Sequence, residues 1–269
     1  MTRFRLSSRT WAVFVIGMVS VAVMYSLIAL KVGGQTGALW TSDLGETGLV
    51  GMSAAFILFV AGRLGLGAVG RPWLWIGLSC VSFAVGDAIW SFTELGLGRQ
   101  VAYPGLPDLF YILVYPLIAI GLTRALLNYR TLVNMRVPVA IAISTGAVVC
   151  GVVYFGFLRP YVLAVGLAPA EAALSSFYPL ADVIFALTPA LAVALVVSKL
   201  GGGRLGWPWW AVIVGVLVFA SADSAYSYLA ARDLYVAGSL VDFGWILANA
   251  FMAFGAAIAL DLAEPTSWR

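Results

Sequence analysis

The stretch PWLWIGLSCVSFAVGDAIW (residues 72–90) decides the fold, because it is an apolar run of membrane-spanning length that contains a single carboxylate, Asp87. A helix needs about 20 predominantly apolar residues to cross a bilayer about 30 Å thick. Similar runs recur along the whole chain: 62% of its 269 residues are hydrophobic and only 10% are charged. Soluble domains have about 45–50% and about 25% of these residues. The sequence therefore predicts an all-α integral membrane protein.

Hydropathy predicts eight transmembrane helices, an even number that puts both chain ends on the same side of the bilayer. The first run, Trp11 to Leu30, is longer than the about 7–15 apolar residues of a secretory signal peptide. We therefore expect it to be an uncleaved span. The expected segments are 11–31, 47–63, 72–96, 108–127, 137–158, 177–199, 207–231 and 240–263.

The basic residues concentrate at alternate segment ends. Eleven lie on the side of the termini: Arg3, Arg5, Arg9, Arg63, Arg71, Arg124, Arg130, Arg136, Lys199, Arg204 and Arg269. Four lie on the other side: Lys31, Arg99, Arg159 and Arg232. Because cytoplasmic loops carry the excess of Lys and Arg, we expect a multi-pass protein of the bacterial inner membrane with both termini in the cytoplasm.

The acids have the opposite bias, which topology alone does not require. Only Asp261 and Glu264 map to the cytoplasmic side. The ten that map to the outer half are Asp43, Glu46, Asp87, Glu94, Asp108, Glu171, Asp182, Asp223, Asp233 and Asp242.

An internal repeat appears when the chain is shifted by 136 residues. Residues 54–92 then align without a gap on residues 190–228, with 12 of 39 positions identical, and Asp87 falls on Asp223. After a two-residue deletion, Asp108 falls on Asp242. We expect two tandem four-helix repeats, residues 1–130 and 131–269, in parallel orientation about a pseudo-two-fold axis along the membrane normal.

Acids and aromatic residues share helix faces near the outer ends of these helices. Residues three or four apart lie on one face of a helix, as Asp87 does with Trp90, and Asp108 with Tyr111. Charged residues within a membrane mark functional sites. The candidate ligand-binding residues are Glu46, Asp87, Trp90, Asp108, Tyr111, Tyr115, Tyr178, Asp182, Asp223, Tyr226, Asp242, Trp245 and Asn249.

A structural role is open for some of these residues. Asp108 and Asp242 open their expected helices, where acids cap the first turn, and Glu46 and Asp182 are expected near helix starts as well. Aromatic residues at this depth also occur as interfacial belts. Asp87 and Asp223 lie inside a helix, where capping does not explain them. We expect both to face the bundle interior across the pseudo-two-fold axis.

Several short motifs resemble a multi-spanning bacterial membrane region that precedes GGDEF and EAL domains, which make and degrade cyclic di-GMP. The motifs are GDAIW (86–90), PDLFYILVYPLIAIGL (107–122), FYPLADVIF (177–185), ADSAYSYL (222–229) and VDFGWILANAFMAFGA (241–256). The resemblance implies a sensor, with motif positions at Asp87, Asp108, Tyr111, Tyr115, Pro116, Tyr178, Pro179, Asp182, Asp223, Asp242 and Trp245. It continues into no output domain here, so we expect a stand-alone module that signals through a separate cytoplasmic protein.

We expect a membrane sensory or ligand-binding module whose periplasm-facing site takes a small cationic or aromatic ligand, since acids and ring faces both attract positive charge. A proton- or cation-coupled transporter is the alternative, and a structural or assembly subunit is the second. The sequence favours none of the enzyme classes, because it has no His, GxSxG, HExxH or phosphate loop, although paired carboxylates can do acid–base work. It indicates no cofactor, no metal site and no nucleic-acid partner.

Overall fold

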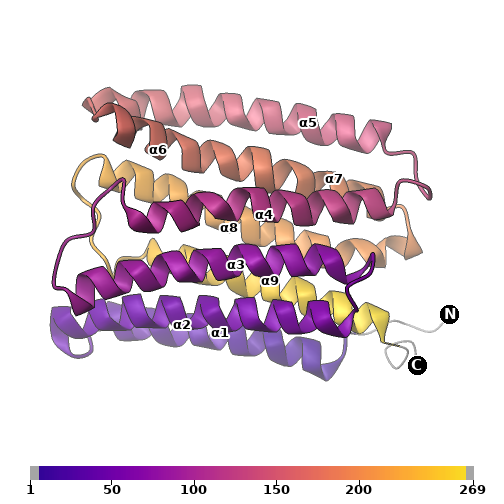
Figure 1. Ribbon diagram of the computed structural model, residues 1–269, viewed down its shortest axis with the longest axis horizontal. Helices are drawn as coiled ribbons and strands as arrows, with labels where there is room; N and C mark the ends of the chain where they lie inside the picture. The colour runs from indigo at the N-terminus through magenta and orange to yellow at the C-terminus, as the bar shows by residue number, and fades with distance from the viewer. Residues whose placement is uncertain (1–5, 265–269) are drawn as a thin grey trace.

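The computed structural model describes residues 6–264 as a bundle of long helices, without a strand in that range (Figure 1). The α-helices are α1 (Ser8–Ala29), α2 (Gly34–Arg63), α3 (Gly70–Ser91), α4 (Leu106–Asn128), α5 (Arg136–Gly151), α6 (Pro169–Ala181), α7 (Thr188–Val197), α8 (Trp207–Ala230) and α9 (Asp242–Ala263). Three π-helical segments extend or join them: Phe92–Gly96, Val152–Val162 and Asp182–Leu187. Short 3₁₀ turns cover Leu163–Val165 and Gly201–Gly206.

Eight helical spans in the described part of the chain are long and apolar enough to cross a membrane, as the sequence predicts. The sixth span runs through α6, the π-helical segment Asp182–Leu187 and α7. Prolines lie in the first turns of α4, α6 and α8, where the missing N–H costs nothing because it has no helical acceptor.

Two of the expected helix starts are wrong. The second span begins at Gly34 rather than near residue 47, and the sixth begins at Pro169 rather than near residue 177. Polar residues lower the hydropathy of both first turns, although the backbone is helical there. Glu46 and Asp182 therefore lie about midway along their spans, and the expectation that they cap helix starts is wrong.

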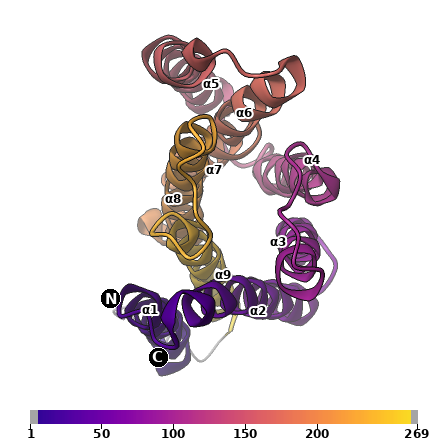
Figure 2. The same ribbon diagram turned by 90° about the vertical axis from the view of Figure 1, so that its left-hand side faces the viewer.

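Six spans form a closed ring (Figure 2). Around the ring, α2 packs on α3, α3 on α4, α4 on the sixth span, the sixth span on α8, α8 on α9, and α9 on α2. The two remaining spans pack outside it: α1 against α9 and α2, and α5 against α7. The first span thus contacts two helices of the ring, whereas the fifth contacts mainly the sixth span.

Glycines allow neighbouring helices of the ring to approach closely at two matching places. A Cβ on Gly121 of α4 would lie 2.9 Å from the Pro72 carbonyl oxygen of α3. A Cβ on Gly255 of α9 would lie 2.8 Å from the Pro208 carbonyl oxygen of α8. Small residues permit such backbone contact between membrane helices.

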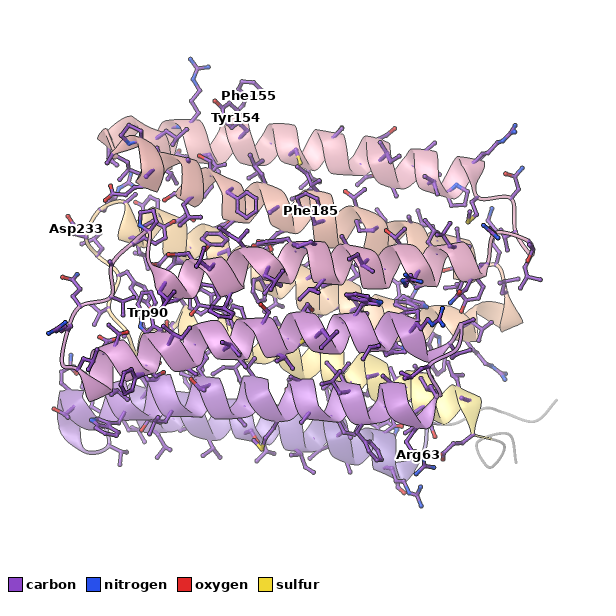
Figure 3. All side chains as sticks on the ribbon, in the orientation of Figure 1. Arg63, Trp90, Tyr154, Phe155, Phe185 and Asp233 are labelled. Atoms are coloured by element: carbon purple, nitrogen blue, oxygen red, sulfur yellow. The ribbon has the colours of Figure 1, made fainter. Side chains whose placement is uncertain are left out.

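The interior of the ring is filled with apolar side chains at the end where Arg63 lies (Figure 3). Trp73 of α3 and Trp209 of α8 stack there, with ring centroids 5.2 Å apart and planes 15° apart. Farther along the same helices, Phe83 and Phe219 meet edge to face at 5.1 Å. Trp90 and Asp233 lie at the opposite end (Figure 3). The interior of the ring is therefore closed by apolar packing at the Arg63 end.

The basic residues that the sequence assigns to one side do flank the same ends of the helices, from Arg9 in α1 to Arg204 before α8. Ser7 donates its backbone N–H to Asp261 at 2.6 Å, which joins the start of α1 to the last turn of α9. Arg63 pairs with Glu264 at the same end, at 3.4 Å. Arg3, Arg5 and Arg269 lie outside the described residues.

Candidate functional site

A buried cavity occupies the ring at the end away from Arg63, above the Phe83–Phe219 contact. The space open to the centre of a water-sized sphere is about 80 Å³, several times the about 10–15 Å³ that one water needs. Helices from both halves of the chain line it: Asp43, Glu46, Phe83, Asp87, Trp90, Ser91, Tyr103, Asp108, Tyr111, Val114, Tyr115, Tyr178, Phe219, Asp223, Tyr226, Tyr235, Asp242 and Trp245.

Six of these lining residues are carboxylic acids and none is basic. Arg232, a basic residue at this end, donates to the backbone carbonyls of Tyr161 and Tyr228 and lies over the Tyr228 ring, 4.1 Å from its centroid. Four of the six acids, Asp87, Asp108, Asp223 and Asp242, instead accept hydrogen bonds from tyrosine, tryptophan, serine or backbone donors. The cavity is therefore an acidic site enclosed by aromatic rings.

Asp108 and Asp242 are the acids at helix starts, but only Asp108 caps its helix; Asp242 is bonded to α2 and to the loop before α9, and makes no cap hydrogen bond to α9 itself. Asp108 accepts the Gly105 N–H at 2.6 Å and the Tyr178 hydroxyl at 2.5 Å. Asp242 accepts hydrogen bonds from a side chain of α2, from a tyrosine and from two backbone N–H groups. These donors are Ser42 Oγ at 2.8 Å, Tyr235 Oη at 3.1 Å, Gly238 N at 2.7 Å and Ser239 N at 3.2 Å. Both side chains also line the cavity, so in Asp108 capping and cavity lining coincide.

Asp87 and Asp223 face the interior of the ring, as expected, with 6% and 8% of their surfaces exposed. The Tyr111 hydroxyl donates to Asp87 Oδ1 at 2.9 Å, and the Trp245 indole N–H donates to Asp223 Oδ1 at 2.6 Å. Each donor comes one turn into the next helix of the ring. Asp223 receives a second bond from the Tyr115 hydroxyl at 3.2 Å.

Three carboxylates on the α2–α3 wall are incompletely bonded. Within the part of the chain that the structure describes, no hydrogen-bond partner reaches Asp43 Oδ2, Glu46 Oε1 or Asp87 Oδ2, although all three atoms are buried. Asp43 and Asp87 are each only 6% exposed. A buried acceptor without a partner loses the full cost of its desolvation. This wall is therefore the part of the cavity with unused bonding capacity.

A chain of aromatic rings lies between the cavity and a neighbouring hollow, because Trp90, Tyr103, Tyr226 and Tyr235 line both. The Tyr226 ring packs edge to face on Tyr103, Tyr235 and Trp245, with centroids 5.9, 4.8 and 5.9 Å apart. Trp90 extends the chain through its contact with Tyr235 at 6.4 Å. Outside these rings, a wider hollow is lined by three further acids, Glu94, Glu171 and Asp233.

Tyr103 and Tyr235 come from the loops that precede α4 and α9. Burial raises the pKa of both phenols above the ordinary value, and nearby acids raise it further. Both rings therefore stay neutral at physiological pH and keep an O–H to donate, which Tyr235 gives to Asp242 and Tyr103 shares with Ser175 at 3.1 Å.

Asp182 and Asn249 line a second, smaller chamber beside the Phe83–Phe219 contact. Asp182 is 2% exposed and its Oδ2 has no partner among the described residues. It begins the π-helical segment of the sixth span, and such segments often occur at functional positions. Hydropathy cannot reveal this irregularity, since the segment is as apolar as its neighbours. Tyr115 lines both chambers.

The structure brings eleven of the thirteen expected site residues into one cavity and puts Asp182 and Asn249 in the chamber next to it. Sequence reasoning missed Asp43, Ser91, Tyr103 and Tyr235 as site residues. Asp43 was expected in a loop before the second span, and the two tyrosines come from loops without a helical pattern. The match of Ser91 with Ser227 at the 136-residue shift was the available signal for Ser91.

Among the described residues, no group of three or more acidic or cysteine side chains is arranged to hold a metal ion. Comparison with known protein-family models, with curated proteins and with solved structures finds no match to this chain. The resemblance to the sensor region of cyclic di-GMP proteins therefore stays a prediction.

Proposed function

We propose that this protein is a sensory or ligand-binding membrane module that takes a small organic cation into the acidic cavity. The observation that carries the proposal is one buried, aromatic-lined cavity to which the described residues contribute six carboxylates and no basic side chain. Removing one partner of a buried charge pair is strongly destabilising, and an acid at mid-membrane costs roughly 2.5–3.5 kcal/mol. A bound cation offsets these costs, and ring faces attract it as well.

An organic cation fits better than a metal ion. Calcium and magnesium need six or more oxygens close around one point, whereas these acids come from five helices and have rings between them. The lining is mainly aromatic and apolar with a few polar groups, which is the usual make-up of a small-molecule site. The ligand would have a cationic group and an apolar body.

We also propose the expected topology for the whole chain. Both termini would be cytoplasmic, because the basic residues flank the closed end of the ring, and the cavity would open to the periplasm. The matching ring contacts, the Gly121 and Gly255 approaches and the Trp73–Trp209 stack support two tandem four-helix repeats, 1–130 and 131–269. In a two-fold arrangement, equivalent residues meet at the axis, and Trp73 corresponds to Trp209.

Aromatic side chains fill the ring interior below the cavity and block a path through the ring, which favours a receptor over a carrier. A ligand in the cavity meets Phe83 and Phe219 and then the stacked tryptophans. One observation favours the transporter alternative: Asp182 lies deeper, near mid-span, in a second chamber, and carriers bind near the midplane. Signalling would pass through a separate cytoplasmic partner.

Thermal unfolding of the purified protein tests the proposal. The probes are a panel of aliphatic and aromatic primary, tertiary and quaternary amines, each paired with the neutral alcohol of the same skeleton. A ligand at 100 times its Kd stabilises the folded state by about 2.7 kcal/mol, so at least one amine should raise Tm while its alcohol does not. Asp87→Asn and Asp223→Asn should abolish the shift, and Asp233→Asn, in the exposed loop at the same end, should keep it.

Equal shifts with amines and alcohols, or no shift with any amine, would contradict cation binding. Uptake into proteoliposomes separates the two functions: a receptor binds the active amine without accumulating it, and a carrier accumulates it in wild-type vesicles but not in Asp87→Asn vesicles.

A further inference from the structure

We infer that the cationic group of the ligand is a primary ammonium seated on the α2–α3 wall, against Asp43, Glu46 and Asp87. The inference rests on the proposed function and narrows it, because it names the chemical class of the cation and the direction in which the ligand lies.

The bonding capacity of the wall carries the inference. Asp43 Oδ2, Glu46 Oε1 and Asp87 Oδ2 are three buried acceptors without a partner among the described residues, and all three side chains line the cavity. The ionised carboxylates of this wall would repel one another, since Glu46 interacts electrostatically with Asp43, Asp87 and Asp242. A primary ammonium has three N–H donors and one positive charge, so its donors match these acceptors in number. A quaternary ammonium has no N–H and leaves all three oxygens without a bond.

The opposite wall differs in a way that orients the ligand. At the 136-residue shift the counterpart of Asp43 is Pro179, and the counterpart of Glu46 is Asp182, which lines the inner chamber instead. Asp223, the counterpart of Asp87, has bonds to both of its oxygens. The second half thus presents saturated acids and the rings of Phe219, Tyr226 and Trp245. The ammonium would point to α2 and α3, and the apolar body to α8 and α9.

Stepwise N-methylation of the ligand's ammonium tests the match between its N–H donors and the three acceptors. Each methyl group added to the nitrogen keeps the charge but removes one donor and adds bulk next to the wall. Charge-assisted hydrogen bonds are individually stronger than neutral ones, and a buried acceptor left without its donor is costly. Affinity should fall at each step, although the methylated cations are no less charged.

The experiment is isothermal titration calorimetry of the full chain in detergent micelles with one primary amine and its N-methyl, N,N-dimethyl and N,N,N-trimethyl forms. The skeleton is the primary amine that gives the largest thermal shift, with 2-phenylethylamine as the first choice. We expect the primary amine to bind more than about tenfold tighter than the trimethyl form, from the size of charged hydrogen bonds. Asp43→Asn and Glu46→Gln should weaken the primary amine and flatten the series. Asp233→Asn should leave the series unchanged.

Two results would overturn the inference. One is a trimethyl form that binds as tightly as the primary amine or more tightly while Asp87→Asn still abolishes binding; cation binding would then stand and the primary ammonium would fall. The other is a series that Asp43→Asn and Glu46→Gln leave unaltered, in variants whose Tm shows that they are folded; the three oxygens would then be satisfied by one another. Absence of binding by every cation would instead contradict the proposed function.

Discussion

Asp87 and Asp223 lie at corresponding depths in α3 and α8, yet their surroundings differ by one hydrogen bond. Each accepts a ring donor from the next helix, Tyr111 or Trp245, and only Asp223 has the additional Tyr115 hydroxyl. The difference leaves one oxygen of Asp87 available to a ligand. Under the proposed function, Asp87 would contact the ligand, whereas Asp223 is part of a completed hydrogen-bond network.

Removal of the Tyr111 hydroxyl tests how much its hydrogen bond to Asp87 contributes to stability and to ligand binding. Tyr111→Phe deletes the hydrogen bond that Asp87 receives from a side chain, so we expect a loss of about 1–3 kcal/mol of stability, the cost of a buried polar group without its partner. Affinity for the cation should change as well, because the carboxylate is no longer held in place. Tyr154→Phe makes the same chemical change on a half-exposed residue of the fifth span and should alter neither Tm nor affinity. Equal effects of the two substitutions would contradict the role given to Tyr111.

At the scale of the elements, the close approaches of α4 to α3 and of α9 to α8 position the walls of the cavity. Gly121 and Gly255 make these approaches ten residues after Tyr111 and Trp245 on the same helices. Any displacement there moves the donors that hold Asp87 and Asp223.

Alanine at either glycine should therefore be destabilising. The added Cβ would lie within 3.0 Å of a proline carbonyl oxygen, and overpacking costs about 1–3 kcal/mol. Gly51→Ala provides the matched control, since its Cβ would meet nothing within 4 Å and Ala is the better helix former by about 1 kcal/mol. Thermal unfolding should give lower Tm for Gly121→Ala and Gly255→Ala and an unchanged or higher Tm for Gly51→Ala. Identical values for all three would show that the close approaches are not needed.

Hydropathy and the 136-residue shift were enough to predict the eight spans and eleven of the eighteen residues that line the cavity, but not the buried Asp43. The start of α2 could not be read in this way, because residues 34–46 are polar for a membrane helix and become helical through contacts such as Ser42 with Asp242. The π-helical turn at Asp182 depends on tertiary packing, so the hydropathy pattern of the sequence contains no signal for it. Tyr103 and Tyr235 reach the cavity from loops, whose paths follow from the packed helices and not from local sequence.

At the scale of the whole molecule, two arcs of three ring helices each meet across the interior through equivalent residues. Trp73 and Trp209 stack with centroids 5.2 Å apart, and Phe83 and Phe219 form the floor of the cavity. We expect these contacts to join the two halves of the chain, so the energies of the paired residues should depend on one another.

A double-mutant cycle measures this dependence. Trp73→Leu and Trp209→Leu should each destabilise the protein, and the double variant should be destabilised by less than the sum, with a coupling of about 0.5–1.5 kcal/mol for an aromatic pair. Trp11→Leu with Trp209→Leu serves as the control, because Trp11 lies on α1 outside the ring. A coupling no larger than in this control pair would mean that the stack does not join the halves.

Orientation in the membrane is testable by cysteine labelling of intact cells. In a background with Cys80→Ala and Cys150→Ala, a cysteine at Asp233 should react with a membrane-impermeant maleimide, since the cavity end would face the periplasm. A cysteine at Lys199, at the other end, should react only after the cells are opened. The reverse pattern would contradict the proposed topology and place the acidic cavity toward the cytoplasm.

The most direct test of the central claim is an experimental structure of the protein with the tightest-binding primary amine. We expect one ligand inside the ring, with its apolar body toward Trp245 and Tyr226. Its nitrogen should lie about 2.7–2.9 Å, the distance of charge-assisted hydrogen bonds, from oxygens of Asp43, Glu46 and Asp87. A nitrogen at the opposite wall would contradict the assigned seat. A ligand bound outside the cavity would contradict the account as a whole.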